Sequence, residues 1–192
     1  MRIAVSGTHS VGKSTLVADI HQAFGSFVHE EEPYRALRDF YPIRFGKEST
    51  RYCNGIQLFY NISRVQQYRS NRDHVIFDRC PIDYIAYSIY TAHHKQTDLD
   101  AAFVGSLIEP VRQALQFLDL IVFVPVSQKH PMHLENDGIR LTDKEYRWEV
   151  DRHFKHLYRD GLYELFDGKG PKLVEVTGSR EERIEQLRPW LA

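Results

Sequence analysis

The sequence has few cysteines, no long apolar run and no excess of charge of one sign. Its two cysteines, Cys53 and Cys80, lie far apart and outside any CxxC pattern. This argues against a disulfide framework or a zinc site and fits a reducing compartment. No apolar run approaches the roughly 20 residues needed to cross a bilayer. The N-terminus has no charged leader followed by a long apolar stretch, so no signal peptide is expected. We therefore expect a cytoplasmic protein without a membrane association.

The charges are nearly balanced, with 25 Lys and Arg against 26 Asp and Glu. An extended nucleic-acid surface needs a basic track, so this balance argues against one while leaving room for a small anion site. The sequence shows no repeats and no low-complexity segment. Its 192 residues, 42% of them hydrophobic, fit a single domain over 1–192 with one buried core.

The sequence does contain apolar strands that alternate with helical segments. We expect strands over 3–5, 27–30, 74–77, 120–124 and 172–176, and helices over 16–24, 55–69, 84–90, 101–117, 143–166 and 180–191. Continuous apolar strands separated by helices predict a parallel sheet covered on both faces. The expected fold class is therefore α/β, a three-layer fold around a five-stranded parallel sheet. Ligands of such sheets bind at the carboxyl ends of the strands.

A phosphate-binding motif follows the first expected strand. Residues 7–14 read GTHSVGKS and match the pattern GxxxxGK[ST]. The backbone N–H groups of such a loop wrap phosphates, and the helix that follows presents its positive N-terminal end to them. We expect Lys13 to reach the β- and γ-phosphates of ATP and Ser14 to ligate Mg²⁺. The residues predicted to hold the nucleotide are Gly7, Thr8, His9, Ser10, Val11, Gly12, Lys13, Ser14 and Thr15.

Further elements favour a kinase among the P-loop proteins. The chain has no NKxD element for a G protein, and its third strand ends in Asp78–Arg79 rather than in paired acids. Small kinases place an acid after the second strand, an acid–arginine pair after the third, and an arginine-bearing lid before the last. The sequence supplies the run EEEPYR over 30–35, the pair Asp78–Arg79, and a lid over about 127–147 with Arg140 and Arg147.

Over nearly its whole length the chain resembles the NadR-type AAA domain group of P-loop kinases, which includes a ribosylnicotinamide kinase domain. The runs 78–87, DRCPIDYIAY, and 137–147, DGIRLTDKEYR, carry this resemblance. The pair Glu32–Pro33 is also similar to deoxynucleoside kinases. The group is functionally mixed. The resemblance therefore implies ATP-dependent phosphotransfer and leaves a nucleoside, a nucleotide or a related small molecule open as the acceptor.

Three charged residues are assigned to the transfer step. Glu32 is expected to take the proton of the acceptor hydroxyl, with Glu30 as the substitute on the same face of the strand. Asp78 is expected to bind Mg²⁺ or a water molecule that is bound to the ion. The alternative role for Asp78 is that of a helix cap. Arg79 is expected to grip substrate or phosphate with its planar fork, and its alternative is a structural pair with Asp83.

The lid arginines and one helix stripe carry weaker expectations. Arg140 and Arg147 are expected to close over the transferred phosphoryl group, with ordinary helix ion pairing as the alternative. The stripe formed by Gln57, Asn61 and Arg64 reads either as a surface for a base or sugar or, more commonly, as a solvated face. Gly178, with Ser179, matches the position where such kinases bind the adenine.

Two other functions stay open. A polynucleotide 5′-hydroxyl kinase shares the chemistry but is disfavoured by the charge balance. A nucleotide-binding switch would show nucleotide-dependent partner binding, whereas a kinase would consume ATP faster when its acceptor is present. An oligomer is compatible with the sequence.

Overall fold

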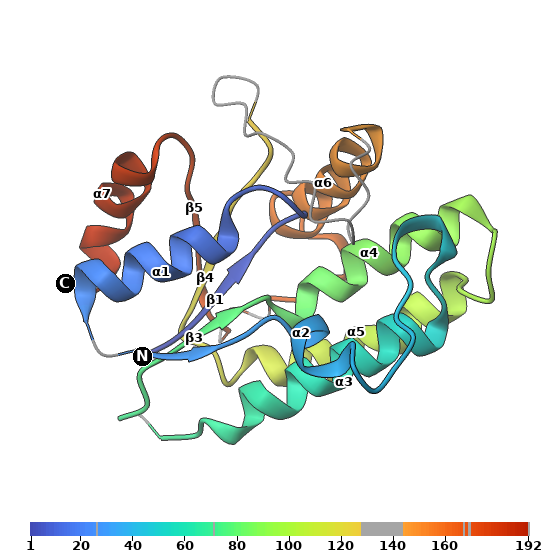
Figure 1. The fold of residues 1–192 in the computed structure, drawn as a ribbon, viewed down its shortest axis with the longest axis horizontal. Coiled ribbons are helices and arrows are strands. Elements are labelled where there is room, and N and C mark those ends of the chain that lie inside the picture. Colours follow the sequence, from blue (N-terminus) through green and yellow to red (C-terminus); the bar gives the residue numbers. More distant parts are fainter. Residues whose placement is uncertain (26, 71, 128–143, 167, 169, 192) are drawn as a thin grey trace.

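Five parallel strands form one sheet in the computed structural model, which describes residues 1–25, 27–70, 72–127, 144–166, 168 and 170–191. The strands are β1 (Arg2–Ser6), β2 (Val28–Glu30), β3 (Val75–Asp78), β4 (Leu120–Phe123) and β5 (Lys172–Glu175). Their order is β2-β3-β1-β4-β5 (Figure 1). The predicted α/β class with a five-stranded parallel sheet is confirmed. The central strand, β1, places Val5 in register with Asp78 of β3 and Val122 of β4.

Helices cover both faces of the sheet (Figure 1). On one face lie α1 (Lys13–Phe24) and α7 (Arg180–Leu191). On the other face lie α3 (Arg51–Gln67), α4 (Pro81–His94), α5 (Ala101–Leu115) and α6 (Lys144–Tyr158). This arrangement leaves the carboxyl ends of the strands facing the loops between these two helical layers.

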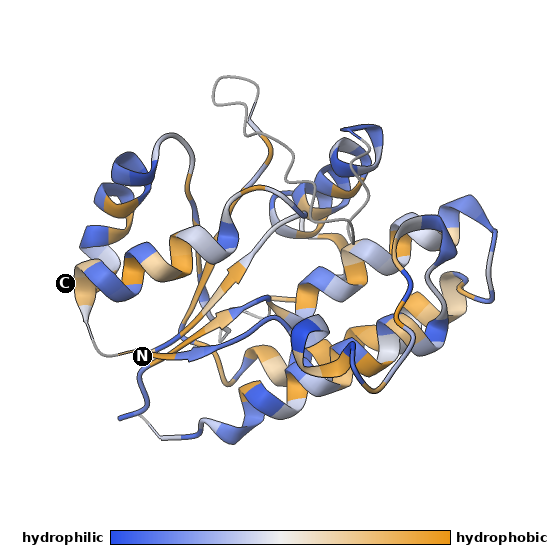
Figure 2. Cartoon of the chain, in the orientation of Figure 1, coloured by the Kyte–Doolittle hydropathy of each residue, from blue (hydrophilic) through white to orange (hydrophobic). Residues whose placement is uncertain are grey.

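The strands alternate their apolar side chains between two separate cores. In β1, Ile3 and Val5 join the core under α1, whereas Ala4 joins the larger core under α3 to α6. In β4, Val122 joins the core under α1 and Phe123 joins the larger core. Figure 2 shows hydrophobic residues along the inner strands of the sheet, between the two helical layers. Each fully buried aliphatic or aromatic side chain contributes about 1.5–3 kcal/mol, so the continuous apolar runs of the sequence hold the sheet in place.

Several expected boundaries were wrong. The helix expected over 143–166 ends as α6 at Tyr158, because Gly161 then adopts a left-handed conformation at φ 68° and a short 3₁₀ turn, η2 (Leu162–Glu164), follows. The helix expected over 55–69 begins at Arg51, where the Thr50 hydroxyl caps it by accepting from Cys53 N at 3.1 Å. The helix expected over 84–90 is longer at both ends and runs from Pro81 to His94 as α4.

Two short elements between β2 and α3 were not expected at all: α2 (Pro33–Leu37) and the 3₁₀ turn η1 (Gly46–Glu48). Within the described chain, no helix combines the length and apolar character needed to span a bilayer. Most of the predicted lid, including Arg140, lies outside the described residues.

Candidate phosphotransfer site

The loop between β1 and α1 follows a path that its two motif glycines make possible. Gly7 has φ 140°, and a Cβ at this position would lie 2.4 Å from the Val124 carbonyl oxygen. Gly12 adopts the left-handed conformation with φ 77° before α1 begins. Any larger residue at position 7 would clash with fixed backbone. The loop therefore packs tightly against the end of β4, with Thr8, His9, Ser10 and Val11 all buried and Thr15 half-buried on α1.

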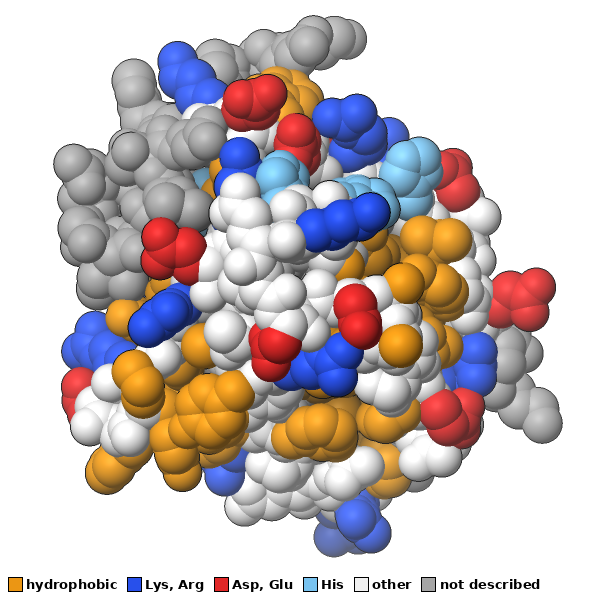
Figure 3. Space-filling view, turned by 90° about the vertical axis from the view of Figure 1, so that its right-hand side faces the viewer, with side chains coloured by type: hydrophobic (Ala, Val, Ile, Leu, Met, Phe, Trp, Pro, Cys, Tyr) orange, Lys and Arg blue, Asp and Glu red, His pale blue; other side chains and the backbone are white. Residues whose placement is uncertain are grey.

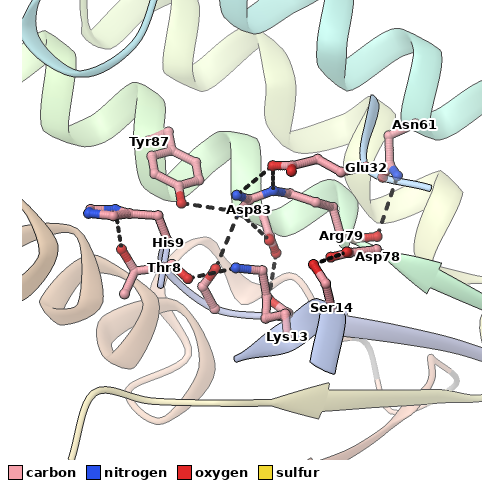
Figure 4. A network of polar contacts seen from close by, with 12 residues as sticks. Thr8, His9, Lys13, Ser14, Glu32, Asn61, Asp78, Arg79, Asp83 and Tyr87 are labelled. Carbon is pink, nitrogen blue, oxygen red and sulfur yellow. Dashed lines mark hydrogen bonds and ion pairs between the residues drawn. The ribbon is translucent and has the colours of Figure 1, made fainter. Parts of the chain in front are cut away.

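Lys13 lies at the centre of a polar network at the carboxyl end of the sheet (Figure 4). Its Nζ donates to the Thr8 carbonyl oxygen at 2.6 Å. Burial and the nearby Arg79 guanidinium together lower the pKa of Lys13 to about 7, against the opposing pull of neighbouring carboxylates. An anion placed in the loop would favour the charged form of this amine.

Ser14 and Asp78 meet across the sheet edge, where the Ser14 hydroxyl donates to Asp78 Oδ2 at 2.6 Å. Asp78 is buried and Ser14 is exposed. A hydroxyl and a carboxylate are oxygen ligands of the kind that Mg²⁺ prefers. In the described residues no three His, Cys, Asp or Glu side chains come together as a metal site. Since Mg²⁺ commonly takes one or two protein ligands and completes its shell with phosphates and water, the pair fits a nucleotide-bound ion.

Arg79 joins two acids that come from different parts of the chain. Its Nε and Nη2 each lie 2.8 Å from Glu32 Oε1, and its Nη1 lies 3.2 Å from Asp83 Oδ2. Nη1 also donates to the Tyr87 hydroxyl at 3.1 Å and to the Gly7 carbonyl at 3.3 Å. The guanidinium is thus fixed between the phosphate loop and Glu32 (Figure 4). Arg79 therefore makes the predicted structural pair with Asp83 and still lies at the site.

The Arg79 backbone is itself unusual, with φ 125° at a residue that has a side chain. Such conformations cost about 1–3 kcal/mol and tend to occur at functional sites. Asp83 is held from the other side by the Ser6 hydroxyl at 2.5 Å, and Ser6 in turn accepts from the Tyr158 hydroxyl at 2.7 Å. Burial raises the pKa of Asp83 to about 6, against the pull of Arg79. A chain of buried hydrogen bonds therefore links α6 to Arg79.

The three acids that end the second strand have separate environments. Glu30 binds Arg64 through two hydrogen bonds of 2.7 and 2.5 Å and also accepts from the Tyr68 hydroxyl. The Glu31 side chain is exposed. Glu32 is buried beside Arg79 and follows the end of β2, so it does not share a strand face with Glu30 as expected.

A pocket opens beside Glu32 and Arg79, between the phosphate loop and helices α3 and α4. Most of the residues that line it are uncharged, and those with a hydroxyl or amide group include Ser49, Asn54, Gln57, Tyr84, Tyr87 and Thr91. Gln57 is buried, with its amide donating to the Cys53 carbonyl at 2.9 Å, and Asn61 is buried below Arg79. Interpreting their helix stripe as a solvated face is therefore wrong for these two residues.

Helix α6 reaches the phosphate loop through two adjacent residues. The Tyr146 ring stacks on His9 with 4.9 Å between centroids, and both line the pocket. Arg147 is buried, and its Nη1 lies 3.4 Å from the Ser10 carbonyl oxygen. Burial lowers its pKa. Arg147 thus lies against the loop, whereas Arg140 falls outside the described residues. The sequence assigned His9 only to the loop and gave no sign of its contact with Tyr146.

Helix α7 also contacts the phosphate loop, through Arg183. Arg183 donates from Nη1 to the Val11 carbonyl at 2.9 Å and from Nε to the Gly178 carbonyl at 3.1 Å. Arg183 therefore joins the Gly178 backbone to the phosphate loop, and the assignment of this turn to the adenine stays a prediction. Arg183 itself was not identified from the sequence, because helical spacing gives no hint of a partner 172 positions away.

Comparison with known proteins agrees with this geometry. A family model described as an AAA domain matches residues 2–183. The fold is similar to deoxyadenosine kinase from M. mycoides with dCMP and dCDP, at a TM-score of 0.65 and 18% identity over 100% of this chain and 98% of that one. It is similar to thymidylate kinase from Candida albicans, at a TM-score of 0.67 and 13% identity over 98% and 88%.

NadR in complex with NAD and AMP-PNP is similar at a TM-score of 0.65 and 18% identity, over 99% of this chain and 49% of that protein. Curated protein sequences give no match. At these identities the likeness shows the fold alone, which is that of the P-loop kinases. The resemblance to the NadR-type group is confirmed.

Proposed function

The chain belongs to the AAA domain family, and from this premise we propose that it is an ATP-dependent phosphotransferase acting on a small, nucleoside-like acceptor. One observation carries the proposal: Lys13, Asp78, Arg79 and Glu32 converge where the phosphate loop meets a polar pocket. A loop that binds phosphates, next to a pocket with a buried carboxylate, is the arrangement that phosphoryl transfer to a hydroxyl requires.

In the proposed reaction the acceptor hydroxyl attacks the γ-phosphorus of ATP. A new O–P bond forms, the bond to the β-γ bridging oxygen breaks, and ADP leaves. The hydroxyl proton passes to Glu32, which Arg79 holds in place at 2.8 Å. Lys13 and the backbone N–H groups of the loop stabilise the charge on the phosphates. Ser14 and Asp78 would hold Mg²⁺, and the ion would neutralise charge on the phosphates of ATP. Arg147 and the predicted lid with Arg140 would exclude water.

The charges of the pocket favour an acceptor without a phosphate. Among the described residues that line it, Arg79 is the only Arg or Lys, and two carboxylates already bind it. Anchoring the phosphate of a nucleotide acceptor calls for further cationic side chains, as in other phosphate sites. The neutral amide and hydroxyl wall suits the sugar and base of a nucleoside. We therefore favour a nucleoside or a related riboside over a nucleotide.

The face drawn in Figure 3 gives no support for a polynucleotide acceptor. Among the residues described on this face, Lys and Arg side chains are interspersed with Asp and Glu and form no continuous basic track. Binding along a nucleic-acid backbone depends on such tracks. A small acceptor that enters the polar pocket is the better fit.

A labelled-ATP screen against nucleosides, nucleotides and pyridine ribosides tests the proposal. We expect ADP formation to rise at least tenfold with one or more nucleosides or ribosides and to stay at background with Lys13→Ala. Circular dichroism would show that this variant remains folded. Full activity of Lys13→Ala, or ATP consumption that no acceptor raises, would overturn the proposal.

A further inference from the structure

Tyr84 differs from the other polar residues in the wall of the pocket. Its side chain is 3% exposed, it lies one turn into α4, and it lines the pocket beside Arg79 and Glu32. Its hydroxyl oxygen is buried and has no hydrogen-bond partner in the part of the chain that the structure describes. Burying a hydroxyl without a partner costs free energy, and native proteins rarely leave such a group unsatisfied.

The neighbouring polar groups are already engaged with the protein. The Asn54 amide donates to the Ser88 hydroxyl at 3.1 Å and its carbonyl accepts from Ser49 at 2.7 Å. Thr91 donates to the Gly46 carbonyl at 2.9 Å, and Tyr87 accepts from Arg79. Unlike these neighbouring groups, the Tyr84 hydroxyl has no hydrogen-bond partner among the described residues.

The surroundings keep this hydroxyl neutral. Burial raises the pKa of Tyr84 well above its usual value. The Arg79 guanidinium acts against this rise, and the carboxylates Glu32 and Asp83 act with it. A neutral phenol both donates and accepts a hydrogen bond. It can therefore bind a hydroxyl, a carbonyl or a ring nitrogen of a ligand, but it provides no charge for a phosphate.

We propose that Tyr84 is a specificity-determining residue, whose hydroxyl binds a second polar group of the acceptor while the reacting hydroxyl lies at Glu32. The proposal rests on the function proposed above and narrows it. The acceptor must carry at least one hydrogen-bonding group besides the hydroxyl that is phosphorylated. Sites that hydrogen-bond a substrate group reject analogues without it strongly, because the buried partner is left unsatisfied.

The substitution Tyr84→Phe tests this directly, since it removes one oxygen and keeps the ring in the core. With the best acceptor from the screen, we expect kcat/KM to fall about 10- to 100-fold, mainly through a higher KM for the acceptor. The KM for ATP should change less than twofold. The matched control is Tyr90→Phe, which alters a buried tyrosine on the same helix outside the pocket. We expect it to leave the KM for the acceptor unchanged.

Thermal unfolding provides a readout that separates recognition from packing. The midpoint of free Tyr84→Phe should not fall below that of the wild type, because the lost hydroxyl has no partner in the free protein. The upward shift in midpoint that the acceptor causes should shrink. A lower midpoint together with an unchanged acceptor KM would assign Tyr84 to the core alone and overturn the inference.

Acceptor analogues that each lack one polar group complete the test. The wild type should discriminate against one of them about 10- to 100-fold, and Tyr84→Phe should lose that discrimination. If the wild type is active but Tyr84→Phe stays within twofold of it for every acceptor, this inference fails while the proposed function stands. A water bound to the hydroxyl would give that result. If the wild type phosphorylates no acceptor, both fail.

Discussion

Replacing Glu32 with glutamine tests the assignment of the proton acceptor with the smallest change in shape. Glutamine keeps an oxygen that accepts a hydrogen bond from Arg79, but it carries no charge and cannot take a proton from the acceptor. General-base catalysis contributes about 10²- to 10⁴-fold in rate. We therefore expect Glu32→Gln to lower the rate of phosphoryl transfer by a factor in that range and to leave the affinity for ATP within about twofold.

The cost to stability follows from the geometry of the ion pair. Two nitrogens of Arg79 lie 2.8 Å from the same carboxylate oxygen of Glu32. Hydrogen bonds to charged groups contribute about 1.5–3 kcal/mol and neutral ones about 0.5–1.5 kcal/mol, so each contact loses about 1 kcal/mol. Arg79 keeps its ion pair with Asp83 at 3.2 Å. The substitution therefore avoids the loss of about 3–5 kcal/mol in stability that is typical of a buried charge left without a partner. The free energy of unfolding should fall by about 2 kcal/mol.

Three measurements check these values: single-turnover transfer with the best acceptor, ATP binding by calorimetry, and urea unfolding. The matched control is Glu31→Gln, which neutralises the exposed neighbouring acid and should match the wild type in all three. The reasoning would be refuted if Glu32→Gln lost ATP affinity tenfold while keeping its transfer rate. Equal effects of the two substitutions would refute it as well, since only one of these acids lines the pocket.

Two further predictions concern the phosphate loop. Because burial holds the pKa of Lys13 at about 7, below its usual 10.5, bound phosphates should restore its charge. ATP binding should therefore be accompanied by the uptake of a proton at pH 8 and by much less proton uptake at pH 6. Calorimetry would show this as a binding heat that varies with the ionisation enthalpy of the buffer. A binding heat at pH 8 that does not vary with the buffer would contradict the prediction. Gly7→Ala places a Cβ 2.4 Å from the Val124 carbonyl oxygen and should abolish ATP binding. In contrast, a Cβ at Gly105 would meet no atom within 4 Å, so Gly105→Ala should stabilise the protein by about 0.5–1 kcal/mol in urea unfolding. ATP binding by Gly7→Ala would contradict the strain argument.

The class and sheet of this fold were predictable because local patterns carry them. Apolar strands such as 120–124 are recognisable without knowing their neighbours, and a motif with glycines at 7 and 12 specifies a strand, a loop and a helix together. The end of α6 at Tyr158 was missed, although a left-handed Gly161 soon follows it. Glycine within an apolar periodic pattern is tolerated often enough that the pattern outweighed the stop signal.

The candidate site was predictable as a set of residue types at strand ends, but its pairings were not. Lys13, Glu32, Asp78 and Arg79 were named from motifs, and the structure brings them together. Which acid accompanies Arg79, how His9 stacks on Tyr146, and that Arg183 holds Val11 all depend on residues far apart in the chain. No local periodicity encodes such contacts. The unfilled hydroxyl of Tyr84 is visible only once its neighbours are placed.

Arg79 shows why the two interpretations of a charged residue near a site need not compete. Spacing alone allowed two roles for Arg79: an ion pair with Asp83, four residues later, or a contact with substrate or phosphate at the site. A guanidinium has five donors in a rigid fork, so one side binds Glu32 while the other binds Asp83 and Tyr87. The structural pair therefore orients the carboxylate proposed to take the proton.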